Sequence, residues 1–250
     1  MTPLETSAII FACIFGGAMV GMWLRGVLPE HHLDAETKDL VKLGVGLIGT
    51  MAALLLGLLV ASAKSSYDER SSELTQVAAN IILLDRILAH YGTETQGIRG
   101  ILKMVVARKI DQIWPKDGKE KGGVNSQTGA EIIFDKIQAL ASRTDAQRTL
   151  QSQAESIAIN LGQTRWLLFA QAGTSISTPF LVIVVFWLVM LFVSFGLFAP
   201  RNATAIVTLL VSAISVAGAM FLILELDSPF SGLMQISSAP LRSALVVLGK

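Results

Sequence analysis

The sequence predicts an all-α integral membrane protein that crosses the bilayer four times. Four stretches, residues 7–24, 43–63, 179–199 and 203–224, carry no charged side chain and are almost wholly apolar. The hydrocarbon core of a bilayer is about 30 Å thick and needs roughly 20 apolar residues as a helix. A helix also satisfies its own backbone hydrogen bonds in lipid. The mean hydropathy of +0.58 fits this class.

The composition excludes several classes of function. The net charge of +1 provides no field that would attract nucleic acid. One cysteine, Cys13, forms no internal disulfide, and three histidines are too few for most transition-metal sites. The first apolar stretch follows Glu5 without a preceding Lys or Arg, so we expect a retained span and no cleaved signal. We expect no cofactor, no metal and no nucleic-acid partner.

The order of apolar and polar segments predicts two hairpins around a central helical bundle. Residues 1–63 form the first transmembrane hairpin and residues 179–224 the second, whose spans are joined by little more than residues 200–202. Residues 64–178 hold 14 Lys/Arg and 12 Asp/Glu, which indicates a solvated domain. Residues 225–250 form a C-terminal segment. An even number of spans places both termini and the polar domain on one side.

The polar domain is expected to be mostly helical. A heptad-like apolar stripe and the absence of Gly or Pro after the second span predict one helix that runs out of the membrane. A second helix is expected over residues 98–113, ending at Trp114–Pro115, before a Gly- and Lys-rich loop at residues 116–128. A third helix is predicted from Glu131 to about Gln171, leading into the third span. The heptad positions are Leu74, Val77, Ile81, Leu84, Leu88 and Tyr91.

The second span carries a narrow stripe of mostly small residues, which we call the small-residue stripe. At about 100° per residue its members share one helix face. Its end members, Lys42 and Lys64, are roughly 33 Å apart at helical rise, so they fit the two mouths of a membrane pore. The members are Lys42, Gly46, Gly49, Ala53, Leu56, Val60 and Lys64.

Two interpretations of this stripe remain open. In a ring of copies it would line a smooth pore with a positive ring at each end, which favours anions. Alternatively, small residues let packed membrane helices approach one another, and lysines at span ends extend to the interface. Asp39, three residues before Lys42, is placed to neutralise it.

Other motifs give weaker indications of function. The glycines 44, 46 and 49 match G-x-G-x-x-G, but they lie inside a membrane span and lack the βαβ context of a dinucleotide site. His31 and His32 lie in an acidic linker, and neighbouring residues do not share a helix face, so we favour a solvated loop over a metal site. The spans hold no Asp, Glu, Lys, Arg or His, which argues against a proton-coupled transporter. No catalytic constellation is present, so we expect no enzyme.

Two short motifs resemble signatures of the bestrophin-like domain family. This family comprises four-span membrane proteins that were long catalogued as a domain of unknown function. The first is Leu-Glu-Leu-Asp-Ser-Pro-Phe-Ser-Gly-Leu at residues 224–233, and the second is Tyr-Asp-Glu-Arg just beyond the second span. The two-plus-two span layout with a central helical domain also matches, so the resemblance covers nearly the whole chain. The motif residues are Tyr67, Asp68, Glu69, Arg70, Asp227, Pro229, Phe230, Ser231 and Gly232.

The resemblance implies a relation to bestrophins, which are pentameric anion channels lined by their second span. It therefore implies a homo-oligomer, with a pentamer favoured. If Lys42 and Lys64 face the conduction path, we expect chloride or similar small anions to pass. The resemblance also implies a multi-pass protein of a cell membrane, of the bacterial inner-membrane type, with cytoplasmic termini. Lys and Arg are divided almost evenly between the two sides, so this orientation comes from the resemblance. The competing interpretation is a non-conducting scaffold or signalling protein that acts through the helical domain.

The chain also departs from the bestrophin pattern. Calcium-responsive bestrophins carry a dense acidic clasp after the last span, where this chain has Glu225 and Asp227 alone. Residues 46–60 contain no Phe, so the aromatic neck of animal bestrophins is missing. Calcium gating is therefore not expected, and the pore diameter and selectivity of bestrophins are not carried over to this chain. We expect Asp227 and the turn at residues 229–232 to fix the end of the fourth span, against the helix that begins near Tyr67.

Overall fold

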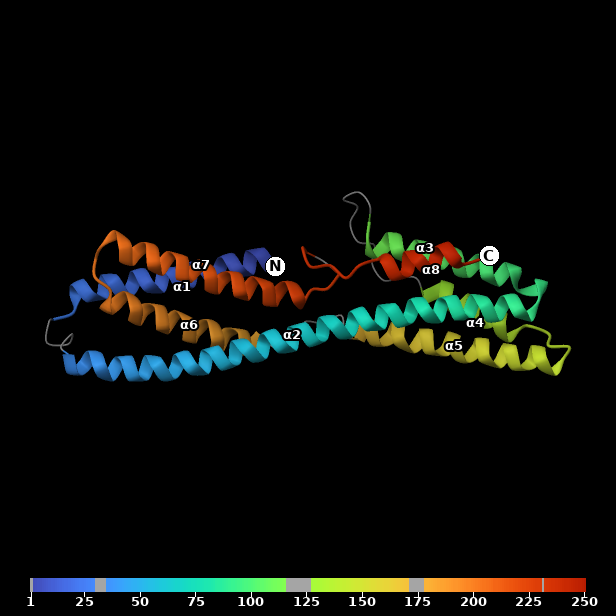
Figure 1. Cartoon of the computed structure of the whole chain (residues 1–250), viewed down its shortest axis with the longest axis horizontal. Coiled ribbons are helices and arrows are strands. Elements are labelled where there is room, and N and C mark those ends of the chain that lie inside the picture. Colours follow the sequence, from blue (N-terminus) through green and yellow to red (C-terminus); the bar gives the residue numbers. More distant parts are fainter. Residues whose placement is uncertain (1, 30–34, 116–126, 171–177, 231) are drawn as a thin grey trace. The chain divides into compact units, whose positions relative to one another are not determined.

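The computed structural model describes residues 2–29, 35–115, 127–170, 178–230 and 232–250, and every regular element in these ranges is helical. Four of the described helices are long and apolar enough to cross a membrane. These are α1 (Pro3–Val27), α2 (Ala35–Tyr91), α6 (Thr178–Phe198) and α7 (Ala203–Leu226). The prediction of an all-α protein with four helices able to span a membrane is therefore confirmed over the described residues (Figure 1).

The remaining elements are shorter and more polar. They are the 3-10 turn η2 (Thr93–Thr95), α3 (Gln96–Ile113), α4 (Gln127–Gln138), α5 (Asp145–Ala170) and α8 (Ala239–Val247). The chain divides into two compact units. The first holds residues 1–67 and 174–234, and the second holds residues 68–173 and 235–250. The sequence placed these boundaries at residues 63/64, 178/179 and 224/225, and the structure divides its C-terminal segment between the two units.

In the first unit, α1 packs against α6 and α7 (Figure 1). The contact between α1 and α6 is close because a glycine on each helix faces the backbone of the other helix. A Cβ added at Gly21 would lie 2.0 Å from the carbonyl oxygen of Val193, and one at Gly196 would lie 2.0 Å from that of Ala18. Small residues allow such approach between membrane helices. The arrangement of the spans as two separate hairpins is not confirmed, since α1 packs on the second pair.

Polar groups fasten the end of α1 to the connection between α6 and α7. The Arg201 guanidinium donates to the carbonyl oxygen of Met22 at 2.8 Å, and Arg25 donates to that of Ala199. Asn202 caps α7 by accepting from the Ala205 N–H at 2.8 Å. Hydrogen bonds therefore fix the short connection at residues 200–202 both to the end of α1 and to the start of α7.

The second unit is built on the C-terminal part of α2, which continues without a break to Tyr91 as expected. Five of the six predicted heptad residues are buried here. Asp85, 1% exposed, receives two hydrogen bonds of 2.8 Å from Arg99 on α3. The buried heptad residues are Leu74, Ile81, Leu84, Leu88 and Tyr91.

The tail of the chain is held in the same unit by basic and aromatic donors. The Trp114 indole donates to the carbonyl oxygen of Ile236 at 3.0 Å, and Lys103 donates to that of Leu248 at 3.0 Å. Arg99 also reaches the carbonyl oxygen of Lys250 at 3.0 Å. These bonds place α8 against α3, which ends at Ile113 as the sequence predicted.

The prediction of one long helix from Glu131 onward is wrong. The chain leaves the helical path between the end of α4 and the start of α5. There the Thr144 hydroxyl accepts from the Gln147 N–H at 3.2 Å, as an N-cap does, and the Gln151 amide donates to the carbonyl of Ile137 at 2.9 Å. The loop at residues 116–126 and the junction at residues 171–177 lie outside the described residues.

Candidate functional site

The membrane part of α2 is the span that its own chain covers least. Of its most apolar 18-residue stretch, 11% is buried, against 39% for α1 and 28% each for α6 and α7. Its inner face is short and holds Ala52, Leu59 and Ala63, which join the core of the first unit. A spanning helix so little covered must meet lipid, water or another copy over most of its circumference.

The small-residue stripe lies beside this inner face, about a quarter-turn away around the helix. The structure exposes five of its members, Lys42, Gly46, Ala53, Val60 and Lys64, and partly buries Gly49 and Leu56. A Cβ at Gly46 would meet nothing within 4 Å, whereas one at Gly49 would touch Leu191 at 3.6 Å. The stripe is therefore an open surface along most of its length and a packing surface at Gly49.

The two lysines of the stripe have different surroundings. Lys42 forms an ion pair of 3.1 Å with Asp39, and both side chains are more than half exposed. The Lys64 ammonium lies 5.4 Å from the centre of the Tyr67 ring, a cation–π distance. The positive charge of Lys42 is thus partly compensated within the chain, as the spacing of Asp39 predicted.

Two further residues on α2 were missed from the sequence. Thr50 and Gly57 are exposed and lie next to the stripe, on the side that faces away from Ala52 and Leu59. They widen the stripe into a broader face of small, uncharged residues. They are recognised once it is known which face of α2 is buried. The sequence does not give that face, because the span is apolar all round and its periodicity favours no side.

A second exposed face of α2 is bulky, and we call it the leucine edge. It comprises Leu40, Leu43, Leu47, Leu54 and Leu58, each 63–75% exposed. At about 100° per residue these positions share one side of the helix, separate from both the inner face and the stripe. Large apolar side chains suit lipid or a partner helix, so the two exposed faces of α2 differ in chemical character.

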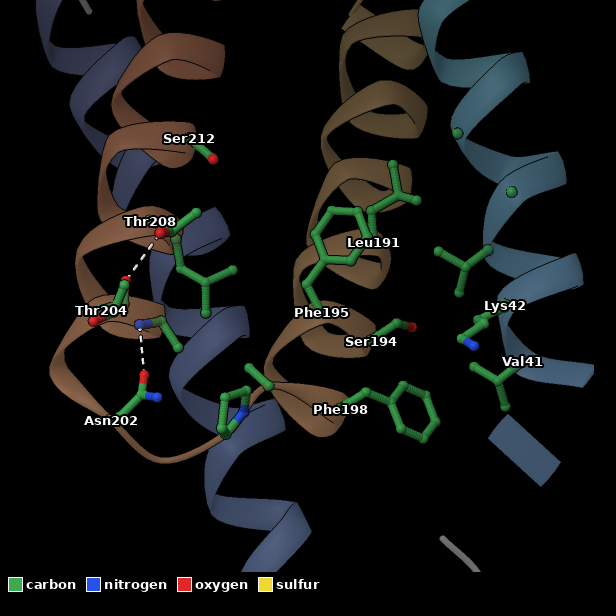
Figure 2. A pocket seen from close by; sticks show the side chains of 17 residues that line it. Val41, Lys42, Leu191, Ser194, Phe195, Phe198, Asn202, Thr204, Thr208 and Ser212 are labelled. Carbon is green, nitrogen blue, oxygen red and sulfur yellow. Dashed lines mark hydrogen bonds between the residues drawn. The ribbon is translucent and has the colours of Figure 1, made fainter. Parts of the chain in front are cut away.

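A groove of about 930 Å³ opens in the first unit between α2, α6 and α7 (Figure 2). Three stripe residues, Lys42, Gly46 and Gly49, line its α2 side, and Phe195 and Phe198 of α6 line its floor. We call this surface the groove. It is mostly apolar and lies at the depth of residues 41–49 of α2.

The α7 side of the groove carries hydroxyl groups at every fourth residue. Thr204, Thr208 and Ser212 stand in a column, with Ser194 on α6 (Figure 2). The Thr208 hydroxyl donates to the Thr204 carbonyl at 2.9 Å, and the Ser194 hydroxyl donates to the Met190 carbonyl at 3.0 Å. Small hydroxylated residues whose donors are satisfied within their own helix are typical of surfaces that another helix approaches.

The C-terminal motif forms a tight turn after α7, built around a buried carboxylate. Glu225, 3% exposed, accepts from the backbone N–H groups of Leu233 at 2.7 Å and Met234 at 3.3 Å. Gly232 has φ +83°, a left-handed conformation that favours glycine. Asp227 and Pro229 are also buried, while Ser231 lies outside the described residues. The turn is thus held by Glu225, which the sequence had not singled out for this role.

The other motif, residues 67–70, falls at the boundary between the units. Tyr67 packs against the apolar core that also holds Ile223 and Leu226 near the end of α7. Asp68 and Glu69 are exposed and Arg70 is 8% exposed in the second unit. Tyr67 therefore belongs to the edge of the core of the first unit.

No arrangement for metal binding appears in the part of the chain that the structure describes, where no three His, Cys, Asp or Glu groups cluster. The His31–His32 pair lies outside the described residues. The exposed Cys13 on α1 carries a free thiol.

The fold and these surfaces define a multi-pass helical membrane protein. A family model for the bestrophin-like domain matches residues 12–241, and the chain belongs to that family. The resemblance noted from the two motifs is therefore confirmed over nearly the whole chain. Neither the curated proteins nor the solved structures gave a match.

Proposed function

We propose that this protein is a passive ion channel that works as a ring of identical copies, with a pentamer favoured by its family. The supporting observation is the state of α2: its own chain covers 11% of its most apolar stretch and leaves its small-residue stripe open. Four spans of one copy cannot easily enclose a water-filled path. Copies arranged around an axis would bring one stripe each to that axis.

The proposed pore is smooth and uncharged between two basic ends. Gly46, Ala53 and Val60 are exposed and carry no polar side chain, while Lys42 and Lys64 stand about 33 Å apart along the helix. Rings of lysine favour anions, and apolar constrictions gate by dewetting. We therefore propose anion selectivity, with chloride as the test ion. Lys64 stands at the opposite end of the stripe from the Lys42–Asp39 ion pair, and it is the charge that we test.

The family also supports a location in a cell membrane of the bacterial inner-membrane type, with cytoplasmic termini and second unit. In this orientation Lys64 lies at the cytoplasmic mouth and Lys42 at the opposite mouth. The four apolar helices support the multi-pass arrangement, and the orientation itself is part of the proposal.

Reconstituted currents test the selectivity. We expect Lys64→Glu to shift the reversal potential in a chloride gradient towards cation preference, because it would replace a positive ring by a negative one. Lys136→Glu, a change of the same charge at an exposed position on α4 of the second unit, is the matched control. An unchanged anion preference in Lys64→Glu contradicts the role of Lys64.

Cysteine accessibility tests which face of α2 meets water. In a Cys13→Ser background, Thr50→Cys, Ala53→Cys and Gly57→Cys should react with a charged thiol reagent added from the aqueous phase and block current. Leu54→Cys and Leu58→Cys, at the same depths on the leucine edge, should not. The opposite pattern would assign the pore to the leucine edge.

The competing function is a non-conducting scaffold or signalling protein. Molecular mass in detergent or nanodiscs separates the two. A monomer would end the pore proposal, and a ring that passes no ion under any voltage or pH would leave the helices of the second unit as the functional part.

A further inference from the structure

The start of α2 carries opposite charges on two different sides. At about 100° per residue, Glu36 shares a side with Leu43 and Leu47 of the leucine edge. Lys38 shares a side with Lys42, which lines the groove. The Lys38 ammonium lies 6.0 Å from the centre of the Phe198 ring, and Phe198 also lines the groove. At the start of α2, the leucine edge is therefore flanked by the acidic Glu36 and the groove by the basic Lys38.

The two sides also differ in shape. The leucine edge projects bulky side chains, with Leu40 72%, Leu43 75% and Leu47 64% exposed. The groove is a hollow of about 930 Å³ bordered by glycines of α2 and hydroxyls of α7. One surface is convex with an acidic end and the other is concave with a basic end, so the two are complementary.

Symmetry then fixes which parts can meet. Copies related by rotation about an axis perpendicular to the bilayer keep each residue at the same depth. The groove lies at the depth of residues 41–49 of α2. A neighbouring copy presents at that depth the first half of its leucine edge. Contact between two different surfaces of the same chain is head-to-tail, and such contacts form a ring when the rotation between copies closes.

We infer that Leu40, Leu43 and Leu47 of one copy pack into the groove of the next, with Glu36 approaching Lys38 of that next copy. This interface rests on the proposed ring. It places the groove-lining side of each α2 and its leucine edge somewhat less than half a turn apart, with Thr50, Ala53 and Gly57 between them. The same contact therefore covers the stripe where it lines the groove and turns the part from Ala53 onward towards the axis.

Disulfide cross-linking of the full chain tests the contact. In a Cys13→Ser background, the pair Leu47→Cys and Thr208→Cys should give a ladder of covalent oligomers on mild oxidation. Leu58→Cys with Thr208→Cys is the depth control, since Leu58 lies about 16 Å further along α2 and should give little product. A ladder of equal strength in the control would overturn the register.

Charge reversal provides a second and independent readout. Glu36→Lys and Lys38→Glu should each lower the yield of the Leu47–Thr208 ladder severalfold, because like charges would then meet across the interface. The double reversal in one chain should restore the yield. Equal loss in the single and double variants would contradict the pairing.

The outcomes separate this interface from the channel proposal. A ring of unchanged mass without a ladder overturns the packing of the leucine edge and leaves the ring standing. If Thr208→Cys in that ring reacts with a lipid-soluble maleimide, the groove holds lipid. A monomer overturns both the interface and the channel.

Discussion

The carboxylate of Glu225 occupies the space that a side chain at residue 232 would need. A Cβ added at Gly232 would lie 2.2 Å from Oε2 of Glu225, and the φ of Gly232 is +83°. The carboxylate cannot simply move away, because it accepts from the N–H groups of Leu233 and Met234. The turn after the fourth span therefore depends on these two residues together.

Gly232→Ala should destabilise the protein by about 2 kcal/mol. This cost combines backbone strain at residue 232 with weaker hydrogen bonds to the Glu225 carboxylate. Thermal unfolding in detergent measures the change. Gly218→Ala on α7 is the control, because a Cβ there meets nothing within 4 Å. In a Glu225→Ala background the cost of Gly232→Ala should fall, and equal costs in both backgrounds would show that the two residues are independent.

Gly21→Ala should separate α1 from α6. The added methyl group would lie 2.0 Å from the Val193 carbonyl oxygen, which is backbone and cannot rotate away. We expect a loss of about 1–3 kcal/mol from overpacking, measured as a lower midpoint of thermal unfolding. Gly16→Ala, where nothing lies within 4 Å, is the matched control on the same helix. Similar midpoints for both variants would contradict the close contact.

Arg99→Met should cost roughly 3 kcal/mol or more, because it leaves the Asp85 carboxylate buried without its charged partner. Chemical denaturation followed by circular dichroism gives the value. The double variant Asp85→Leu with Arg99→Met should recover much of the loss, since it removes both charges. If the double variant is less stable than Arg99→Met alone, the buried charge is not the cause.

The Asp85–Arg99 pair also predicts a dependence on pH. Burial acts to raise the pKa of Asp85, but hydrogen bonds from Arg99 and the Gly249 N–H, with the Arg99 charge, outweigh it and hold the pKa below its usual value. A lowered pKa gives stability above the unfolded value of about 3.9 and loses it as pH falls through the folded value. The stability gap between the wild type and Asp85→Asn should therefore shrink below about pH 4. A gap that is constant with pH would contradict this account.

The spans and most helix ends were predictable from local patterns. Apolar runs mark the part of each helix inside lipid, so α1 extends from Pro3 to Val27 beyond the predicted residues 7–24. The continuous α2 followed from the absence of Gly and Pro. The break before Asp145 was missed because side chains make it: Thr144 caps α5, and Gln151 reaches back to the end of α4.

The candidate site was less accessible from sequence. Helical spacing grouped the stripe from Lys42 to Lys64, but it could not say which faces of α2 stay open. That depends on α6 and α7, which lie more than a hundred residues away in the chain. The groove likewise requires Phe195 and Thr208 beside Gly46, a meeting that no local pattern encodes.

The glycine contact between α1 and α6 has a mechanical consequence. Where two backbones touch at Gly21 and Gly196, no rotamer can change to accommodate sliding. The arginines 25 and 201 clamp the same pair at one end. The span of α2 joins the same core through small and aliphatic side chains, Ala52, Leu59 and Ala63. The pair of α1 and α6 should therefore behave as one rigid body in any assembly that the protein forms.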